Sequence, residues 1–281
     1  MSNLKQQTIK KEISVSGTGL HTGKRVNIKF IPAKVDSGIN FIRADLPGRP
    51  RIKADIRNVS STIRGTNLAR PGSAAADGVN TIEHILSALF ALSIANLDVE
   101  LDGPEPPSLD GSSKQYCELM TKAGIAPQGS RIKCITITRP VIEMSGDKCI
   151  IALPSDRFTV GFMINYPLDL IGTQFYVFDL NAPRYIKEIA PARTYGFMDE
   201  LETLKKQGLA LGANAGNAVA IGSSGYMTEL RFKDELVRHK ILDLIGDLSL
   251  LGARINGRII SIRSGHDLNI RFAKKLLKEV G

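Results

Sequence analysis

The sequence contains no tryptophan and only three cysteines among its 281 residues. Cys117, Cys134 and Cys149 are odd in number and form no CxxC pair, so neither a disulfide framework nor a cysteine-rich zinc site is expected. No run of about 18 apolar residues is present, which predicts that no helix spans a membrane. The N-terminal stretch MSNLKQQTIKKE lacks the apolar segment of a secretory signal, and we therefore expect a cytoplasmic protein.

Acidic residues are in deficit, since Asp and Glu number 28 against 37 Lys and Arg, which gives a net charge of +9. A positive balance favours anionic partners, namely nucleic acid, a phosphorylated metabolite or an acidic membrane surface. The sequence has no zinc finger, no RNP-type aromatic motif and no long basic run. Nucleic acid is therefore the weakest of these three expectations.

The length of the chain allows two domains of about 130–150 residues each. Hydrophobic residues make up 43% of the chain and charged residues 23%, so either half can bury a core of its own. The segment GIAPQGS, around residues 124–130, has the Gly, Pro and Ser content of a linker. We therefore predict an N-terminal domain over residues 1–127 and a C-terminal domain over residues 128–281.

Hydrophobic periodicity predicts strands first and a long helix late in each half. The predicted strands cover residues 9–15, 24–30, 39–43, 52–59 and 97–103 in the first half and 133–138, 148–153, 159–166 and 258–264 in the second. The predicted helices cover residues 81–94, 114–123, 196–207, 233–251 and 268–280. The helix over residues 81–94 is apolar on almost every side, which indicates that it is buried.

The chain has four histidines, and their positions are informative. His84 follows Glu83 in the motif NTIEHILSAL. In one interpretation Asn80 is the N-cap of the helix and Glu83 completes a capping box, which leaves His84 as a core residue. In the other interpretation His84 is a metal ligand with partners elsewhere in the chain. The order Glu-His, in place of HExxH, excludes the usual zinc-protease helix.

A second candidate site lies in the motif LVRHKILDLIGDLSLLG. At about 100° per residue, His239, Asp243 and Asp247 share one face of the predicted helix. One interpretation is a solvated polar face with i,i+4 pairs. The other is a metal site, because His-x3-Asp places an imidazole and a carboxylate about 5–6 Å apart at Cβ. Gly246 and Leu236 on the same face are unusual for a surface left to water.

His266 lies in IRSGHDLN, where a predicted strand ends and a helix begins, and His21 lies in the Gly-rich turn GTGLHTG. Functional groups favour such positions, although a locally hydrogen-bonded loop histidine is the alternative at both. Two histidines and one aspartate together suit a catalytic Zn²⁺ that keeps one position open for water. Glu83 points about 100° away from His84 on the predicted helix, so it can act as a general base without binding the metal.

The motifs of the chain resemble those of the UDP-3-O-acyl-N-acetylglucosamine deacetylases, zinc enzymes of lipid A synthesis in Gram-negative bacteria. The matching segments run in the family's order over nearly the whole chain: SGTGLHTGK, NTIEHILSAL, PSLDGSS, APARTYGF, LVRHKILDLIGDLSLLG and RSGHDLN. The resemblance implies an α+β fold of two domains, each packing helices against β-sheet, with the active site in the cleft between them. It also implies hydrolysis of the 2-N-acetyl group of a UDP-linked, acylated glucosamine.

Transferred motif by motif, the resemblance implies a role for each candidate residue. The implied zinc ligands are His84, His239 and Asp243, which bind one Zn²⁺ per chain, with Fe²⁺ as the alternative metal in the cell. The implied catalytic residues are Glu83 as general base, His266 as protonated acid, Asp247 as the residue that orients His266, and Thr194 as the donor to the oxyanion. The implied substrate contacts are Lys240 and Tyr195, the second at a position where the family more often has phenylalanine.

Two other interpretations of the chain stay open at this point. A nucleic-acid-binding protein would show steeply salt-dependent affinity and no metal requirement. A catalytically inactive relative would keep the fold without turnover, although the complete set of candidate residues argues against it. The sequence also leaves open the acyl-chain length, the oligomeric state, the role of His21 and any peripheral contact with the inner membrane.

Overall fold

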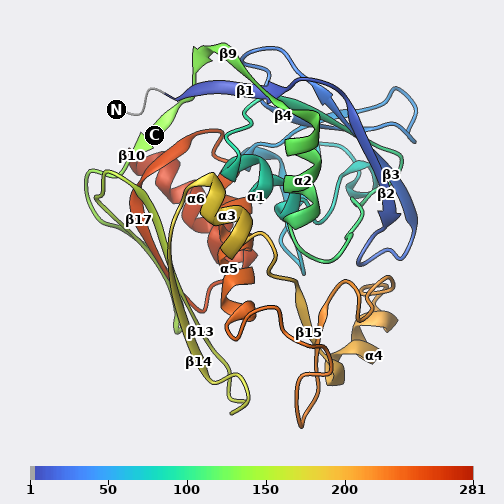
Figure 1. Cartoon of the computed structure of the whole chain (residues 1–281), viewed down its shortest axis with the longest axis vertical. Coiled ribbons are helices and arrows are strands. Elements are labelled where there is room, and N and C mark those ends of the chain that lie inside the picture. The colour runs from blue at the N-terminus through green and yellow to red at the C-terminus, as the bar shows by residue number, and fades with distance from the viewer. Residues whose placement is uncertain (1–3, 281) are drawn as a thin grey trace.

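Alternating apolar residues form the inner faces of two separate mixed sheets, which enclose most of the helices between them (Figure 1). A computed structural model describes residues 4–280. The chain has an α+β fold, as predicted. In β2 (Ile13–Thr18), Ile13 and Val15 are half-buried while Ser14 and Ser16 are exposed, and this period of two recurs in most strands.

The N-terminal sheet consists of five strands in the order β2-β3-β8-β4-β5. Besides β2, these strands are β3 (Arg25–Pro32), β4 (Ile39–Arg43), β5 (Arg51–Lys53) and β8 (Leu97–Leu101). In this sheet β4 and β8 run parallel, whereas the other neighbours are antiparallel. Helix α2 (Lys114–Ala123) covers the fully buried Phe30 through an edge-on contact with Tyr116.

The C-terminal sheet runs in the order β11-β12-β17-β13-β14, and β10 adds to β17. Its strands are β10 (Cys134–Thr136), β11 (Val141–Ser145), β12 (Lys148–Leu153), β13 (Phe158–Asn165), β14 (Thr173–Asp179) and β17 (Arg254–Ile262). Helices α5 (Glu235–Ser249) and α6 (His266–Val280) pack against this sheet. The central strand β17 leads directly into α6, which places the first residue of α6 beside α5.

Three small sheets and several short helices connect these layers. The small sheets pair β1 (Lys5–Ile9) with β9 (Ile125–Arg131), β6 (Val59–Ser61) with β7 (Asn67–Leu68), and β15 (Tyr195–Phe197) with β16 (Val219–Ile221). The other helices are α1 (Glu83–Ala91), α3 (Ala182–Glu188), α4 (Met198–Lys206) and the 3₁₀ turns η1 (Ile56–Asn58) and η2 (Ala75–Asp77).

Three sequence predictions of secondary structure are wrong. The segment 124–130, predicted as a linker, forms β9 and pairs with β1. The single strand predicted over residues 9–15 is two strands, because the charged residues 10–12 stay exposed where the chain passes from β1 to β2. The strand predicted over residues 52–59 divides among β5, η1 and β6. Each error lies where the chain passes from one sheet or helix to the next. Hydrophobic periodicity indicates which residues are buried, but not where the chain changes direction.

The two large sheets lie on opposite sides of residue 127 in the sequence. The division into domains 1–127 and 128–281 itself stays a prediction, because β1 and β9 join the two ends of the N-terminal half across that boundary. None of the helices within residues 4–280 combines the length and the apolar character needed to cross a membrane.

Helices α1 and α5 form the central contact of the molecule (Figure 1). Every residue of α1 is buried, as its apolar sequence predicts. The two backbones approach closely at Gly246, where an added Cβ would overlap the carbonyl oxygen of Glu83 and lie 2.8 Å from its carbonyl carbon. Glycine is therefore the residue that this crossing requires.

We predict that Gly246→Ala destabilises the fold, because a methyl group must push α1 away from α5. Overpacking of this kind costs about 1–3 kcal/mol, which corresponds to a fall in Tm of roughly 3–10 °C for a chain of this size. Thermal unfolding followed by circular dichroism measures the change. Gly129→Ala is the control, because a Cβ at that position meets no atom within 4 Å. Equal Tm values for the two variants would show that the crossing tolerates a side chain.

Candidate active site

The first turn of α1 places two buried polar residues, Glu83 and His84, against α5. The residue that precedes the helix is Ile82, and no side chain caps the helix N-terminus. The capping-box interpretation is therefore wrong. Instead, Oε2 of Glu83 accepts a hydrogen bond of 3.0 Å from the backbone N–H of Thr66.

His239, Asp243 and Asp247 share one face of α5, as predicted, and all three are buried. The interpretation of this face as solvated is wrong, because α1 covers it. Nε2 of His239 lies 3.3 Å from Oδ1 of Asp243, and Nε2 of His84 lies 3.8 Å from the same oxygen. His239 and Asp243 are four residues apart on one helix, whereas His84 precedes His239 by 155 residues in the sequence. The structure brings all three together.

The donor set of His84, His239 and Asp243 fits a metal ion, since one ligand atom from each lies within 4.8 Å of the others. Oδ1 of Asp243 is buried and has no hydrogen-bond partner in the described part of the chain, whereas Oδ2 accepts from Nζ of Lys240 at 2.6 Å. Nδ1 of His239 donates to the carbonyl of Ala192 at 3.1 Å, which leaves the lone pair on Nε2. A cation at this point would satisfy the orphan oxygen and both imidazoles.

The electrostatics of the set agree with this geometry. Burial lowers the pKa of His84, and it lowers the pKa of His239 to about 3, so both imidazoles are neutral at pH 7. Burial opposes ionisation of Asp243, but the neighbouring His239 and Lys240 outweigh it and hold the pKa of the carboxyl well below its usual range. Neutral imidazole and carboxylate are the protonation states that metal binding requires.

His266 begins α6 and is fixed by a hydrogen bond from its Nδ1 to Oδ2 of Asp247, at 2.9 Å. Asp247 is fully buried and also accepts from Asn269 at 2.8 Å and from the hydroxyl of Thr66 at 2.5 Å. Burial alone would lower the pKa of His266, but Asp247 and then Glu83 raise it to about 9. The imidazole is therefore protonated at neutral pH, in contrast to His84 and His239.

Glu83 faces His266 across the site, with Oε1 at 3.9 Å from Nε2 of the imidazole. Burial raises the pKa of Glu83 to about 7, with the charges of Asp243 and Asp247 adding to the effect and His266 opposing it. Glu83, Asp243 and His266 also lie close enough to hold a metal. Because both nitrogens of His266 face carboxylates, that imidazole carries two protons and has no lone pair to offer.

The remaining candidates, Thr194, Tyr195 and Lys240, border this group. The ammonium of Lys240 lies 5.5 Å from the centre of the Tyr195 ring, and that ring lies 6.0 Å from the ring of His239. The hydroxyl of Tyr195 bonds that of Tyr166 at 2.8 Å. Thr194 is held by its backbone between Gly111 and Val219, and its hydroxyl bonds no residue within the range 4–280.

Several residues that position the site were not identified from the sequence. Thr66 links Glu83 to Asp247, and no local pattern marks it. The buried ion pair of Arg193 and Glu235, at 2.8 Å, fixes the segment that carries Ala192 and Thr194 to the start of α5. Asn269 lies in the quoted motif RSGHDLN, so its polar side chain on an amphipathic helix was the available signal.

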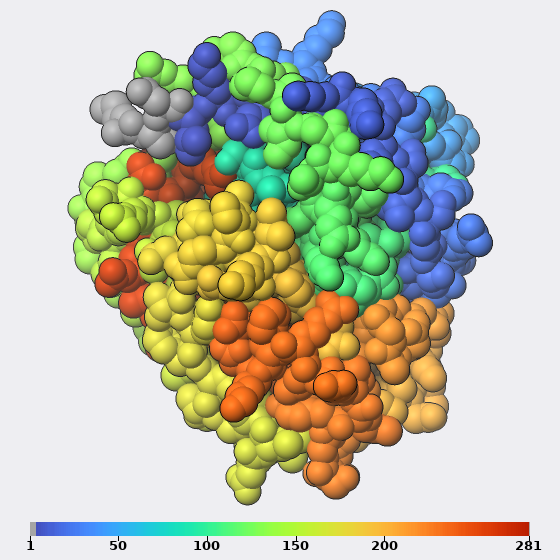
Figure 2. Space-filling view, viewed as in Figure 1, coloured from blue at the N-terminus to red at the C-terminus, as the bar shows by residue number. Residues whose placement is uncertain are grey.

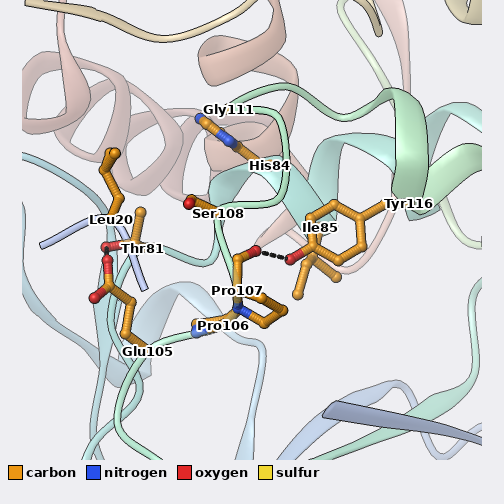
Figure 3. A pocket seen from close by; sticks show the side chains of 10 residues that line it. All are labelled: Leu20, Thr81, His84, Ile85, Glu105, Pro106, Pro107, Ser108, Gly111 and Tyr116. Carbon is orange, nitrogen blue, oxygen red and sulfur yellow. Dashed lines mark hydrogen bonds between the residues drawn. The ribbon is translucent and has the colours of Figure 1, made fainter. Parts of the chain in front are cut away.

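His21 lies outside this group and joins loops. Its Nε2 bonds the carbonyl of Arg64 at 3.0 Å, and its Nδ1 accepts from the backbone of Ala210 at 3.3 Å. Between the His21 loop and α1 lies a small cavity of about 10 Å³, lined in part by Glu105 and His84 (Figure 3). A space of this size holds about one water molecule.

Comparison with known proteins matches the chain to one kind of enzyme. The profile of the UDP-3-O-acyl N-acetylglycosamine deacetylase family matches residues 6–278. A UDP-3-O-acyl-N-acetylglucosamine deacetylase from Citrifermentans bemidjiense is 41% identical over 275 residues, which cover 97% of this chain and 89% of that protein. Proteins of the same name from Syntrophotalea carbinolica and Thermodesulfovibrio yellowstonii are also 41% identical, over 97% of this chain and 87% and 92% of their own lengths.

We predict that Thr66→Val destabilises the protein, because it leaves Oδ1 of Asp247 buried without its hydroxyl donor. An unsatisfied buried acceptor costs about 1–3 kcal/mol, and more when it is charged. Urea denaturation measures the free energy of unfolding. Thr66→Ser keeps the hydroxyl and serves as the matched control, for which we expect a loss below about 1 kcal/mol. A valine variant as stable as the serine variant would remove Thr66 from the network.

Proposed function

The chain belongs to the UDP-3-O-acyl-N-acetylglucosamine deacetylase family, and we propose that it hydrolyses the 2-N-acetyl group of such a UDP-linked sugar and releases acetate. This would be the committed step of lipid A biosynthesis. The observation that carries the proposal is Oδ1 of Asp243, which is buried, unpartnered and faced by two neutral imidazoles. Amide hydrolysis needs a metal or an equivalent electrophile at such a point, with a base and an acid beside it.

The metal proposed for this site is one Zn²⁺ per chain, held by His84, His239 and Asp243, with Fe²⁺ as the alternative in the cell. Nitrogen and carboxylate donors of this kind suit either ion. When bound, the metal supplies Lewis acidity, which polarises a carbonyl and makes water a stronger acid. The second oxygen of Asp243 is held by Lys240, so this carboxylate offers one oxygen to the metal.

Proton transfer is assigned to the two residues that flank the donor set. Glu83 is proposed as the general base, because its pKa of about 7 lets it accept a proton from the attacking water and release it at neutral pH. His266 is proposed as the acid, since it holds a proton at pH 7 and can donate it to the leaving amine. Asp247 keeps that imidazole oriented and charged. Both pKa values are raised, but Glu83 starts as a carboxyl and His266 as an imidazole. Glu83 therefore titrates near neutral pH, whereas His266 stays protonated there.

The substrate contacts are proposed among the residues that border the donor set. Thr194 has a hydroxyl free of other described residues and is proposed as the donor to the oxyanion. Tyr195 and Lys240 are proposed to bind the sugar or the diphosphate. The ammonium of Lys240 lies over the Tyr195 ring, and this contact leaves its N–H groups able to donate to an anion. The net positive charge of the chain favours a substrate that carries the negative charge of a diphosphate over a neutral substrate.

The setting of the enzyme is also a proposal. We propose two domains, residues 1–127 and 128–281, with the substrate bound in a cleft between them, because α1 and α5 supply the site from the two halves. A cytoplasmic location is supported by the cysteines, all three of which are free. Thiols that stay unpaired are typical of a reducing compartment. No nucleic-acid partner is proposed.

The deacetylation assay that tests this proposal compares two variants. Glu83→Gln should keep about one zinc per chain, because Glu83 is not a ligand, while turnover falls by about 10²–10⁴ for want of a base. His239→Gln should lose both zinc and turnover. Metal content is measured by atomic emission and activity by acetate release from the UDP-sugar. Glu118→Gln, on the exposed face of α2, is the control. Loss of zinc from the Glu83 variant would contradict the division between ligand and base.

The alkaline limb of the pH profile tests the role of Asp247. An acid acts only when protonated, so activity should fall as pH rises through the pKa of His266. The charge of Asp247 raises that pKa, so Asp247→Asn should move the alkaline limb of kcat/KM to lower pH. Asp267→Asn is the control, because this neighbouring carboxylate is 70% exposed. An unmoved limb in the Asp247 variant would show that another group titrates there.

A further inference from the structure

The outer face of the C-terminal sheet carries two unbroken apolar rows that cross five strands. Strand register aligns the first row directly across the sheet: Ile142, Ile151, Ile260, Gly161 and Val177. The same register aligns the second row: Met144, Cys149, Ile262, Met163 and Phe175. These ten residues are called the outer stripe below. None of them is charged, and none bears a polar group other than the Cys149 thiol.

The stripe faces away from the helices of the core. The residues that alternate with it in the strands, such as Ile150, Phe162 and Ile259, are fully buried on the inner face. The most exposed side chains of the stripe lie on its edge strands β11 and β14, where Met144 is 61% exposed, Phe175 57% and Val177 50%. The stripe residues of the three central strands are half-buried, apart from Gly161, which is buried. Exposed apolar side chains usually occur singly on a protein surface, and a contiguous patch of a few hundred Å² often marks a functional contact.

The N-terminal sheet of the same chain provides an internal comparison. The register of its outer face aligns Ser14, Lys29, Glu100, Ile42 and Arg51. Its charges are paired, for example Arg49 with Glu100 and Arg51 with Asp98. The N-terminal sheet therefore presents mostly polar and ion-paired side chains to solvent, as is usual for an exposed sheet face. The apolar outer face of the other is not required by the architecture.

One margin of the stripe carries both a cation, Arg258, and a carboxylate, Asp179, of which only the carboxylate has partners within residues 4–280. The next row across the sheet contains Arg258, which is exposed and forms no ion pair within the described residues. The acidic residue of that row, Asp179, is already bonded to the hydroxyl of Thr159 and lies 4.0 Å from Arg184. A cation beside an apolar surface matches the arrangement that binds proteins to anionic bilayers.

We propose that the outer stripe docks on the surface of a bilayer that contains anionic lipids. Five strands about 4.8 Å apart and two rows about 7 Å apart give a footprint of roughly 300 Å². A stable protein dimer buries about 800 Å² on each partner, so the stripe alone is too small to hold a second copy. Two chains of charge +9 would also repel each other, whereas the same charge attracts an anionic surface. Bilayer contact has no minimum area, because it grows with the apolar surface inserted and the opposite charge met.

Vesicle co-sedimentation tests the proposal on the intact chain. The probes are large unilamellar vesicles of phosphatidylcholine alone and of phosphatidylcholine with an equal part of phosphatidylglycerol. We expect the wild-type chain to bind the anionic vesicles more strongly and to lose binding as salt rises. The double variant Met144→Ser/Phe175→Ser should lower the partition coefficient at least about tenfold, since it removes the two most exposed side chains of the stripe.

The matched control is Ile63→Ser/Val35→Ser, which removes apolar side chains that are 73% and 42% exposed outside the stripe. It should bind like the wild type, while Arg258→Glu should weaken binding to anionic vesicles alone. Absence of wild-type binding, equal binding by the stripe variant, or no preference for anionic lipid would each overturn the proposal. So would a wild-type dimer in analytical ultracentrifugation that the stripe variant dissociates, because a second copy would then cover the face.

Bilayer docking is independent of the chemistry proposed for the active site. The stripe lies on the opposite face of the sheet from α5, which carries His239 and Asp243. The stripe variant should therefore deacetylate a dissolved substrate at the wild-type rate, whether or not it binds vesicles. Failure of the deacetylation assay with vesicle binding intact would overturn only the proposed function.

Discussion

The close crossing of α1 and α5 is the contact on which the rest of the site depends. Glu83 and His84 come from the first of these helices and His239 and Asp243 from the second, so their distances are set by how closely the backbones approach. Gly246 permits that approach, and burial on all sides of α1 keeps it in place. In space-filling view the yellow segment that contains α3 and the green segment that contains α2 lie side by side over this part of the molecule (Figure 2). The packing of α1 against α5 therefore sets the distances between the site residues.

Five ionisable residues are buried at one crossing, namely Glu83, His84, His239, Asp243 and Asp247. Such burial is costly unless each residue finds a partner. The carboxylates of the site differ in how they are satisfied. Asp247 is satisfied by three donors, and one oxygen of Asp243 is satisfied by Lys240. The other oxygen of Asp243 is left without a donor in the described chain, which is why it marks the place of a cation. An unsatisfied atom in an otherwise complete network is more informative than the network itself.

What the sequence predicts depends on the distance over which the contacts act. The face of His239, Asp243 and Asp247 follows from helical period alone. Glu83, His84 and His266 are candidates from their local sequence positions, and the resemblance adds their roles. Thr66 escapes both, because its partner Asp247 lies 181 residues away and no periodic pattern joins them. The pairing of β1 with β9 escapes for the same reason: strand register is decided by tertiary contacts. The assigned roles of the site residues, unlike their positions, remain predictions.

Strand β17 shows how one short sequence serves both sides of a sheet. Ile259 belongs to the core beneath α5 and α6, whereas Ile260 and Ile262 alternate outward into the stripe. The end of the same strand delivers His266 to Asp247. Because the inner positions must pack and the carboxyl end must present the imidazole, only the outer positions are free to vary. Their apolar character in this sheet, beside an ion-paired outer face in the other, is therefore a property that folding does not demand and that a bilayer contact explains.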